Sequence, residues 1–321
     1  MRAGRLPATG GGDADLTPVV CAAKRLFYHG VMTTRERISV SLAARHGLPV
    51  ERCHVRPLGG GATGATFDVD LGGRRGFLKW LSQGDALEAE ADGLVALSPV
   101  VRVPKVIDQG PLAGGSGLLL EWLSLAPVDE GQGWPALGRA LRALHDVRGD
   151  QFGYHRDNWI GASPQINTPD RDWARFFVAR RLAPQLRRAR DHGLDSATVD
   201  RVETVMARVP GWLSGLKVEP SLVHGDLWQG NVAGLPDDTT GVVLFDPAVY
   251  YGDAEVDLAM LSLFGRVPEN FYHAYGIKPG DADFQHRARL YNLYHLLNHF
   301  NLFGGGYAGA VSATVTTLLR S

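Results

Sequence analysis

Three side chains in one region of the sequence constrain the fold of this chain more than any other feature. Asp226 and Asn231 lie in the run His224-Gly-Asp-Leu-Trp-Gln-Gly-Asn231, and Asp246 ends a short apolar segment that follows it. An aspartate can accept a proton from an attacking hydroxyl group, and amide and carboxylate oxygens are ligands that magnesium prefers. A fold that uses this motif must bring two separate segments together beside a site for a nucleoside triphosphate.

The spacing of these residues matches the catalytic loop of protein kinases. Asp226 and Asn231 follow the pattern Asp-x-x-x-x-Asn, and Asp246 stands where kinases place a second metal-binding aspartate. The motif predicts phosphoryl transfer from ATP, with Asp226 as the catalytic base and with Asn231 and Asp246 as ligands of Mg2+. Such a motif also arises by chance in long chains, so the prediction requires the other parts of a kinase.

A glycine-rich run lies between two strand-like segments and contains Gly59, Gly60, Gly61, Ala62 and Thr63. It lacks the Gly-Lys-Ser/Thr of a P-loop and the following helix of a dinucleotide-binding motif. In kinases, a strand–loop–strand run of this kind covers the nucleotide phosphates. We therefore predict that these residues bind the nucleotide, although the run by itself fits a plain glycine-rich hairpin equally well.

Lys79 is the predicted anchor of the nucleotide phosphates. It lies in a strand-like segment and shares a face with the apolar Phe77 and Leu81, which stand at alternating positions. A solvated lysine on an edge strand is the alternative interpretation. The following helical segment carries Glu88 and Glu90, whose side chains lie roughly 200° apart around a helix, so only one can face the lysine. We predict the pair Lys79–Glu90.

The apolar segment 118–123 ends in Glu121, Trp122 and Leu123, at the predicted change of lobe. A strand in this position can present backbone N–H and C=O groups to an adenine ring, while its side chains form an apolar pocket. We predict that these three residues contact the nucleotide. A simple core strand would have the same sequence pattern, so the two interpretations remain open.

Residues near the motif have less specific patterns. Trp228 is predicted to contact the acceptor by stacking on a sugar, with ordinary packing as an equally weighted alternative. His224 is predicted to be a structural histidine rather than a base. Asp253 is predicted to cap the helix that follows it, and Asp257 to form a hydrogen bond back to the catalytic loop.

Two further patterns favour ordinary structural roles. His295 and His299 have the spacing of metal ligands on a helix, but no carboxylate motif accompanies them, so packing is the preferred interpretation. The arginine-rich stretch 180–190 is predicted to be one solvated helix face.

Composition excludes several classes of protein. A net charge of -1 offers no basic field for nucleic acid or an anionic membrane. No apolar run approaches the ~18 residues of a membrane helix. The two cysteines, Cys21 and Cys53, form neither a disulfide framework nor a zinc site, which favours a reducing cytoplasm. Residues 1–32 have little periodicity and are expected to form a disordered tail, with Met32 as a candidate first residue of the folded protein.

Hydrophobic periodicity predicts an α+β fold with two lobes. Residues 33–123 are predicted to form a small β-rich lobe, with strands at 52–58, 65–71, 74–81, 106–110 and 118–123 and helices at 33–47 and 86–97. Residues 124–321 are predicted to form a larger helical lobe, with a buried strand at 242–245 and helices at 137–147, 173–192, 196–209, 255–264 and 284–300. This is the arrangement of a bilobal protein-kinase-like fold.

Longer blocks of the sequence resemble one family in particular. The segments VHGDLWQGN, FDPAVYYGDAEVDLAM, YNLYHLLNHFNLFGGGY and FGYHRDNWIGASPQINTPDRDWARFFVARRLAPQL are similar to the fructosamine kinase (ketosamine-3-kinase) family. The resemblance covers about residues 33–307, in order. Aminoglycoside and choline kinases share the HGD-x-x-x-x-N core, but the tryptophan after HGD and the DPA-x-YYG block are not typical of them.

The resemblance implies ATP-dependent phosphorylation of the 3-hydroxyl group of a ketosamine, an activity linked to deglycation. The acceptor would be a small-molecule or glycated-protein ketosamine, either a fructosamine or a ribulosamine. Many members of the family carry a redox-sensitive cysteine in the glycine-rich loop where this chain has Ala62, so a monomer is expected rather than a disulfide-linked dimer. The roles that the resemblance implies are those given above for Asp226, Asn231, Asp246, Lys79, Glu90 and Trp228.

Two alternative functions remain at this point. One is a phosphotransferase of the aminoglycoside or choline type, with a different acceptor. The other is a nucleotide-binding protein without catalytic activity, although such proteins usually lack at least one of the residues that are intact here, namely Lys79, Asp226, Asn231 and Asp246.

Overall fold

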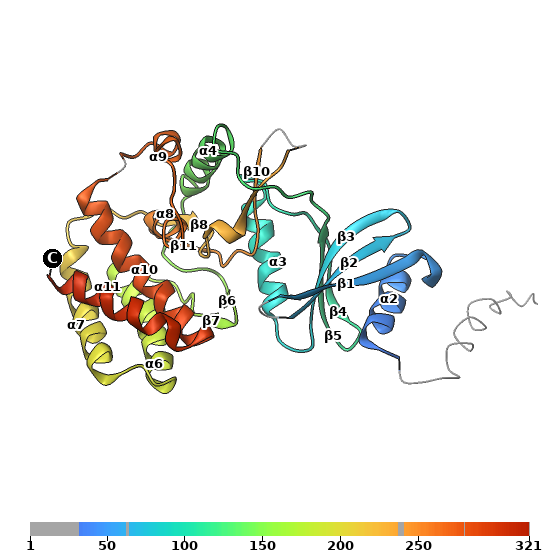
Figure 1. The fold of residues 1–321 in the computed structure, drawn as a ribbon, viewed down its shortest axis with the longest axis horizontal. Coiled ribbons are helices and arrows are strands. Elements are labelled where there is room, and N and C mark those ends of the chain that lie inside the picture. The colour runs from blue at the N-terminus through green and yellow to red at the C-terminus, as the bar shows by residue number, and fades with distance from the viewer. Residues whose placement is uncertain (1–31, 62–63, 237–240, 279, 321) are drawn as a thin grey trace, which may run out of the picture.

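The computed structural model describes residues 32–61, 64–236, 241–278 and 280–320. A β-rich lobe lies at one end of the molecule and a helical lobe at the other, with helix α3 (Ala86–Leu97) between them (Figure 1). The predicted α+β bilobal fold is therefore confirmed. The predicted amino-terminal tail lies outside the described residues, except for Met32.

The β-rich lobe is built on one five-stranded antiparallel sheet in the order β1-β2-β3-β5-β4. Strand β3 is central, and its register sets Lys79 opposite Thr66 of β2 and Leu118 of β5. Lys79 is therefore not the edge-strand residue of the alternative interpretation. The strands are β1 (Cys53–Gly61), β2 (Gly64–Leu71), β3 (Arg74–Leu81), β4 (Val106–Leu112) and β5 (Gly115–Glu121).

The two helices of this part of the chain pack into different cores. Helix α2 (Thr34–Arg45) begins with a capping box, in which Thr33 accepts a hydrogen bond from the Glu36 amide and the Glu36 carboxylate accepts one from the Thr33 amide. Its buried Ile38 and Leu42 belong to the apolar cluster of the sheet. The apolar face of α3 instead belongs to the large core of the helical lobe, so α3 is packed against both lobes.

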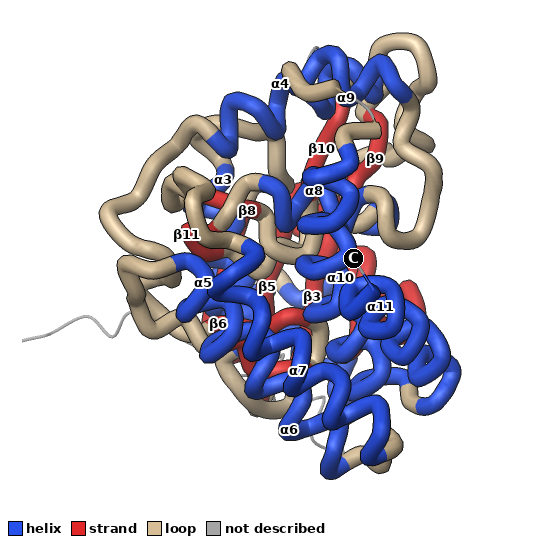
Figure 2. Tube along the Cα trace, turned by 90° about the vertical axis from the view of Figure 1, so that its left-hand side faces the viewer, coloured by secondary structure: helices blue, strands red, loops and turns tan. Residues whose placement is uncertain are grey.

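The helical lobe surrounds one long helix, α10 (Ala282–Phe303), more than half of which is buried. Helices α10 and α11 lie side by side (Figures 1 and 2). The sequence patterns did not predict α9 and α11. The other helices of the lobe are α4 (Gly133–His145), α5 (Trp173–Phe176), α6 (Ala183–Asp191), α7 (Ser196–Trp212), α8 (Glu255–Leu261), α9 (Glu269–Tyr275) and α11 (Ala308–Arg320).

Short two-stranded sheets hold the catalytic segments at both ends. Strand β8 (Ser221–Val223) ends directly before the HGD motif and pairs with β11 (Tyr250–Gly252). Strand β9 (Val232–Gly234) begins directly after Asn231 and pairs with β10 (Val242–Leu244). The β9–β10 register brings Asn231 next to Phe245, whose amide donates a hydrogen bond to the Asn231 carbonyl at 3.1 Å. The pairing thus brings Asn231 close to Asp246. A third two-stranded sheet is the hairpin of β6 (Asn158–Ile160) and β7 (Ser163–Gln165).

The arginine-rich stretch 180–190 is not a uniformly solvated face, because Arg181 is completely buried. Its guanidinium group donates hydrogen bonds to the Ile166 carbonyl at 2.6 Å and to Asn167 Oδ1 at 2.7 Å, and it lies 3.9 Å from the centre of the Tyr250 ring. Arg181 belongs to a π-helical turn, Phe177–Leu182. A π-helical turn shifts the helical phase, so a prediction based on regular α-helical spacing places this side chain on the wrong side.

Candidate active site

The catalytic loop holds Asp226 and Asn231 in direct contact. Asn231 Nδ2 donates a hydrogen bond to the Asp226 carbonyl at 2.9 Å and lies 3.3 Å from Asp226 Oδ2. The loop is closed by a short 3₁₀ turn, Gln229–Asn231, that leads into β9. The two residues of the Asp-x-x-x-x-Asn pattern therefore lie on one side of the loop, as the sequence predicted.

Asp246 adopts an unusual backbone conformation. Its φ is 57°, in the left-handed region that residues other than glycine rarely occupy. Such strained positions cluster at functional sites. Its carboxylate lies 2.6 Å from Lys79 Nζ, so the segment after β10 reaches across to the sheet of the other lobe.

Lys79 contacts Glu90, and Glu88 is directed elsewhere. The distance from Lys79 Nζ to Glu90 Oε1 is 2.7 Å, whereas Glu88 pairs with Arg156 at 2.9 Å. Burial disfavours the charge on Lys79, but the carboxylates of Glu90 and Asp246 outweigh this effect and raise its pKa. Lys79 is therefore a fixed cation at all physiological pH values.

A cavity of about 720 Å³ lies between the two lobes and is lined by residues from both. Its volume is in the range of small-molecule and cofactor sites. The polar side chains that line it are those of Thr66, Lys79, Glu90, Glu121, Asp226, Asn231, Asp246, Asn158, Asn298 and His299. The structure thus brings the predicted residues of the kinase motif and the predicted lysine–glutamate pair to one cavity.

The three residues predicted to contact adenine also line this cavity. Glu121 is the last residue of β5, so Trp122 and Leu123 follow the strand rather than belong to it. Glu121 forms an ion pair with Arg102, and the guanidinium group of Arg75 lies 3.5 Å from the centre of the Trp122 ring. Side-chain contacts with Arg102 and Arg75 therefore help to hold the segment between the lobes in place.

The glycine-rich run is only partly described. Gly60 and Gly61 end strand β1, and Ala62 and Thr63 lie outside the described residues. Gly59 lines the cavity and has a φ of 117°, which an L-amino acid side chain rarely adopts. Glycine at this position thus has a conformational reason, because the register of β1 against β2 shifts between Pro57 and Gly59.

Asp226 is partly buried in a site that favours its protonated form. Burial raises the pKa of Asp226 to about 7, and the negative charge of Asp246 acts in the same direction. A carboxylate whose pKa lies close to neutrality is better matched to accepting a proton from a hydroxyl group than an ordinary aspartate is. Its environment therefore suits a general base.

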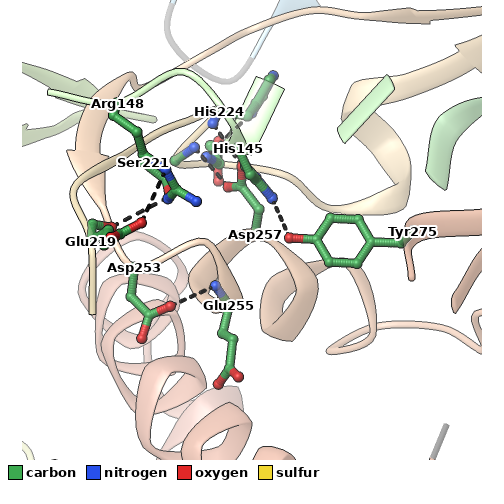
Figure 3. Close-up of polar contacts among 11 residues, drawn as sticks. His145, Arg148, Glu219, Ser221, His224, Asp253, Glu255, Asp257 and Tyr275 are labelled. Atoms are coloured by element: carbon green, nitrogen blue, oxygen red, sulfur yellow. Dashed lines mark hydrogen bonds and ion pairs between the residues drawn. The ribbon is translucent and has the colours of Figure 1, made fainter. Parts of the chain in front are cut away.

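Asp257 forms the predicted hydrogen bonds to the catalytic loop (Figure 3). Its carboxylate accepts hydrogen bonds from the backbone amides of His224 at 2.7 Å and Gly225 at 2.9 Å. His145 Nε2 lies 3.1 Å from the same carboxylate, and His145 Nδ1 lies 2.8 Å from the Tyr275 hydroxyl. Although burial acts in the opposite direction, these partners hold the pKa of Asp257 below its ordinary value. Asp257 is therefore a buried anion that fixes the loop.

His224 has a structural role in the loop, because its ring is buried and both of its nitrogens have backbone partners. The Asp226 amide donates to Nδ1 at 3.3 Å, so Nδ1 is an acceptor, and Nε2 lies 3.1 Å from the Phe245 carbonyl, so Nε2 carries the proton. Burial lowers the pKa of His224, in agreement with this neutral form. The imidazole therefore connects the loop to the segment that leads to Asp246.

Asp253 contributes to the start of helix α8, as predicted, but from one position before the helix cap. Its Oδ1 accepts a hydrogen bond from the Glu255 amide at 2.9 Å, while Ala254 occupies the cap position. The other carboxylate oxygen accepts a hydrogen bond from the Tyr291 hydroxyl at 2.6 Å. Asp253 therefore also ties α8 to the central helix α10.

Aromatic and apolar side chains line the end of the cavity near Trp228. The Trp228 side chain is partly exposed and packs edge-on against Phe264, with 6.3 Å between ring centres. Trp159, His299 and Phe303 line the same cavity, and the sequence analysis did not assign them to the site. Each of them lies in a block that resembles the family, and His299 was otherwise noted only for its spacing from His295.

The donors in the cavity fit a magnesium ion bound together with nucleotide phosphates. Asn231 and Asp246 supply an amide and a carboxylate oxygen, and magnesium typically takes one or two protein carboxylates and completes its shell with water and phosphate oxygens. Within the described ranges, no cluster of three or more His, Cys, Asp or Glu side chains could hold a metal by itself. The pair His295 and His299 is therefore not part of such a cluster, and His299 Nδ1 lies 2.8 Å from the carbonyl oxygen of His295.

Comparisons with known proteins point to one family. The sequence profile of the family described as fructosamine kinase matches residues 34–321. A probable ketoamine kinase of Synechocystis is 41% identical over 292 residues, which cover 89% of this chain and 97% of that protein. The chloroplastic protein-ribulosamine 3-kinase of Arabidopsis thaliana is 39% identical over 239 residues, which cover 73% of this chain and 72% of that protein. The crystal structure of a candidate fructosamine-3-kinase of Thermobifida fusca matches with a TM-score of 0.75 and 33% identity, covering 88% of this chain and 99% of that one.

Proposed function

Because the chain belongs to the fructosamine kinase family, we propose that it transfers the γ-phosphoryl group of ATP to a sugar hydroxyl group of a ketosamine. In this reaction the hydroxyl oxygen forms a bond to the γ-phosphorus, the bond between that phosphorus and the bridging oxygen of ADP breaks, and the hydroxyl proton leaves. We propose that this hydroxyl group is the one at carbon 3 of a fructosamine or a ribulosamine, which the name of the Arabidopsis thaliana relative supports.

The observation that supports this proposal most directly is the convergence of two groups of residues on one cavity. Asp226, Asn231 and Asp246 reach it from the helical lobe, and the Lys79–Glu90 pair reaches it from the other lobe. Phosphoryl transfer depends on positioning and on charge stabilisation, and these side chains supply both.

Each residue has a distinct role in the proposed mechanism. Asp226 accepts the proton of the acceptor hydroxyl group, and its pKa of about 7 suits that task. Lys79, held by Glu90, binds phosphate oxygens as a cation. Asn231 and Asp246 would hold magnesium, which when bound neutralises negative charge on the phosphates. The glycine-rich run Gly59–Thr63 and the segment Glu121–Leu123 are proposed to bind the nucleotide, and Trp228 the acceptor.

Replacing Asp246 with Ala is expected to weaken the binding of ATP in the presence of magnesium by about tenfold or more, because a metal ligand is lost. Calorimetry with and without magnesium measures the effect, which should be much smaller when the metal is absent. Asp246→Asn is the matched variant, since asparagine tolerates the left-handed backbone conformation and removes only the charge. Unchanged affinity for magnesium-bound ATP in both variants would remove Asp246 from the metal site.

Acceptor profiling tests the proposed function itself. The purified protein is incubated with ATP, magnesium and fructosyl-lysine or ribulosyl-lysine, with an aminoglycoside and choline as competing acceptor classes, and ADP release is measured. We expect ADP release with a ketosamine and a phosphate on carbon 3 in the NMR spectrum of the product. Preferred transfer to an aminoglycoside or to choline, or ATP binding without transfer to any acceptor, would contradict the proposal.

The cellular setting is also proposed. Cys53 is a free, buried cysteine, and a chain with so few cysteines suits a reducing compartment, so we place the protein in the cytoplasm, acting on free or protein-bound ketosamines in deglycation. Among the described residues, no helix has the length and apolarity needed to cross a bilayer. We propose a monomer without nucleic-acid or membrane partners, because this chain has Ala62 where the family resemblance implies a redox-sensitive cysteine.

A further inference from the structure

We propose that residues 155–159 of the helical lobe position helix α3, and through it the Lys79–Glu90 pair, so that the acceptor side and the nucleotide side of the cavity are coupled. This inference rests on the proposed kinase function, because it assigns a role in binding ATP and the acceptor. Residues 155–159, hereafter the clasp, include the first two residues of strand β6 and face α3 across the boundary between the lobes.

Three side chains of the clasp contact α3. Arg156 Nη1 lies 2.9 Å from Glu88 Oε1, and its Nη2 lies 3.6 Å from Asp85 Oδ2. Trp159 Nε1 donates a hydrogen bond to Asp85 Oδ1 at 2.8 Å. His155 Nε2 lies 3.4 Å from Asp92 Oδ1 on the same helix.

The acidic residues that the clasp contacts form one stripe along α3. Asp85, Glu88 and Asp92 are spaced at i, i+3 and i+7, which places them on the same side of a helix. Glu90 lies roughly 200° around the helix from Glu88, on the side that faces Lys79. Contacts along the stripe therefore fix the rotation of α3 about its axis, and this rotation determines where Glu90 points.

The contact of Asp85 with the clasp takes the place of a stabilising hydrogen bond at the start of α3. It occupies the N-cap position of α3, where an aspartate normally accepts a hydrogen bond from an amide of the first helical turn. Here its side chain forms no capping hydrogen bond and is directed to Trp159 and Arg156 instead. The helix thus forgoes a common stabilising interaction in favour of contacts with the other lobe.

The clasp is itself fixed to the segment that carries Asp246. Asn158 Nδ2 donates a hydrogen bond to the Val249 carbonyl at 2.8 Å, and Gln165 Nε2 donates to both Asn158 Oδ1 at 2.8 Å and the Ala248 carbonyl at 3.0 Å. These side chains are buried. A rigid connection therefore runs from the Asp246 segment through the clasp to α3.

Trp159 extends this connection to the acceptor. Its ring lines the cavity together with Trp228, while its Nε1–H group holds Asp85. An acceptor that contacts the Trp159 ring thus contacts a side chain that positions α3. ATP and the acceptor should then each increase the affinity of the other by the same factor, because coupling between two binding sites is reciprocal.

Direct packing of α3 on the catalytic segment is the competing explanation. Gly93 lies against Pro247 and Val249 so closely that a Cβ atom there would lie 3.2 Å from the Pro247 side chain. If this packing alone positioned α3, loss of the clasp contacts would leave nucleotide binding unchanged. Variants that alter the clasp and leave Gly93 intact therefore distinguish the two explanations.

Trp159→Phe and Arg156→Gln are the test variants. Trp159→Phe keeps a smaller aromatic ring on the cavity and removes the hydrogen-bond donor to Asp85, and Arg156→Gln removes the ion pairs. Arg190→Gln, which breaks a half-exposed ion pair with Glu203 on helices away from the cavity, is the matched control. Affinity for a non-hydrolysable ATP analogue with magnesium is measured by calorimetry, with and without a ketosamine.

The clasp variants should bind the ATP analogue about twofold to tenfold more weakly than the unaltered protein, the range of one hydrogen bond or ion pair. The factor by which a ketosamine increases nucleotide affinity should fall toward one, while thermal stability changes no more than in the control. Combining Trp159→Phe with Asp85→Ala should weaken binding no further than Asp85→Ala does alone.

Unchanged nucleotide affinity and unchanged coupling in both folded clasp variants would overturn the inference. Failure of the proposed function gives a different result, because the unaltered protein would then release no ADP with any ketosamine. A purely structural role would lower thermal stability without changing the coupling factor, and that outcome also contradicts the inference.

Discussion

Replacing Asp226 with Asn is expected to lower kcat by about 10²–10⁴-fold, the usual contribution of a positioned general base. Asparagine has the same shape as aspartate and can still contact Asn231, but it cannot accept the proton of the attacking hydroxyl group. The affinity for ATP should change little, because Asp226 contacts the acceptor hydroxyl rather than the nucleotide in the proposed mechanism. Steady-state kinetics with a ketosamine acceptor, together with calorimetry of ATP binding, measure both quantities.

Asp200→Asn is a suitable control, since this carboxylate is exposed on helix α7 and belongs to no part of the site. Its kinetics should equal those of the unaltered protein. An Asp226→Asn variant that retains full kcat would show that another group accepts the proton. A variant that loses ATP binding as strongly as turnover would instead place Asp226 in the nucleotide site.

Replacing Asp257 with Ala is expected to lower the free energy of unfolding by about 3–5 kcal/mol, the typical cost of removing one partner from a buried, charged network. The substitution leaves the amides of His224 and Gly225 without their acceptor and deprives His145 of its carboxylate. The midpoint of thermal unfolding should fall by roughly 10 °C. Denaturant titration and differential scanning calorimetry measure the two quantities.

Asp146→Ala provides the comparison, because Asp146 is largely exposed and pairs with Arg142 on the same helix turn. Exposed pairs contribute at most about 1 kcal/mol, so this variant should remain close to the unaltered protein. Equal stability losses in the two variants would mean that the Asp257 network does not support the fold. An Asp257 variant that is folded at low temperature should also have reduced kcat, because the catalytic loop loses its fixed position.

Features set by short-range patterns could be predicted from the sequence. Strand β3 and helix α3 have the predicted boundaries, because alternating and helical periodicities are local properties of the chain. The contact of Glu90 rather than Glu88 with Lys79 follows from helical angles alone once the lysine side is known. The hydrogen bonds from the catalytic loop to Asp257 were also predicted, since a buried loop needs acceptors for its amides.

Features that depend on contacts between distant segments could not be predicted. His145 lies 112 positions before Asp257 and 130 before Tyr275, and no local pattern relates these residues. Strand β10 was predicted from the apolar run 242–245, but the other three-residue strands, β6 to β9 and β11, are too short to show an alternation. The burial of Arg181 depends on a π-helical turn, which has no recognised pattern in a single sequence. Tertiary packing decides all of these features.

The position of Lys79 between Glu90 and Asp246 has a consequence for the order in which ligands enter. Along the described part of the cavity wall, this one cation faces the carboxylates of Glu90 and Asp246, so negative charge is in excess. A bare triphosphate, itself a polyanion, would be repelled at the entrance, whereas a triphosphate already complexed with a divalent cation carries less negative charge and brings a second cation to these carboxylates. The empty protein would thus admit its phosphoryl donor as a metal complex and discriminate against the uncomplexed nucleotide.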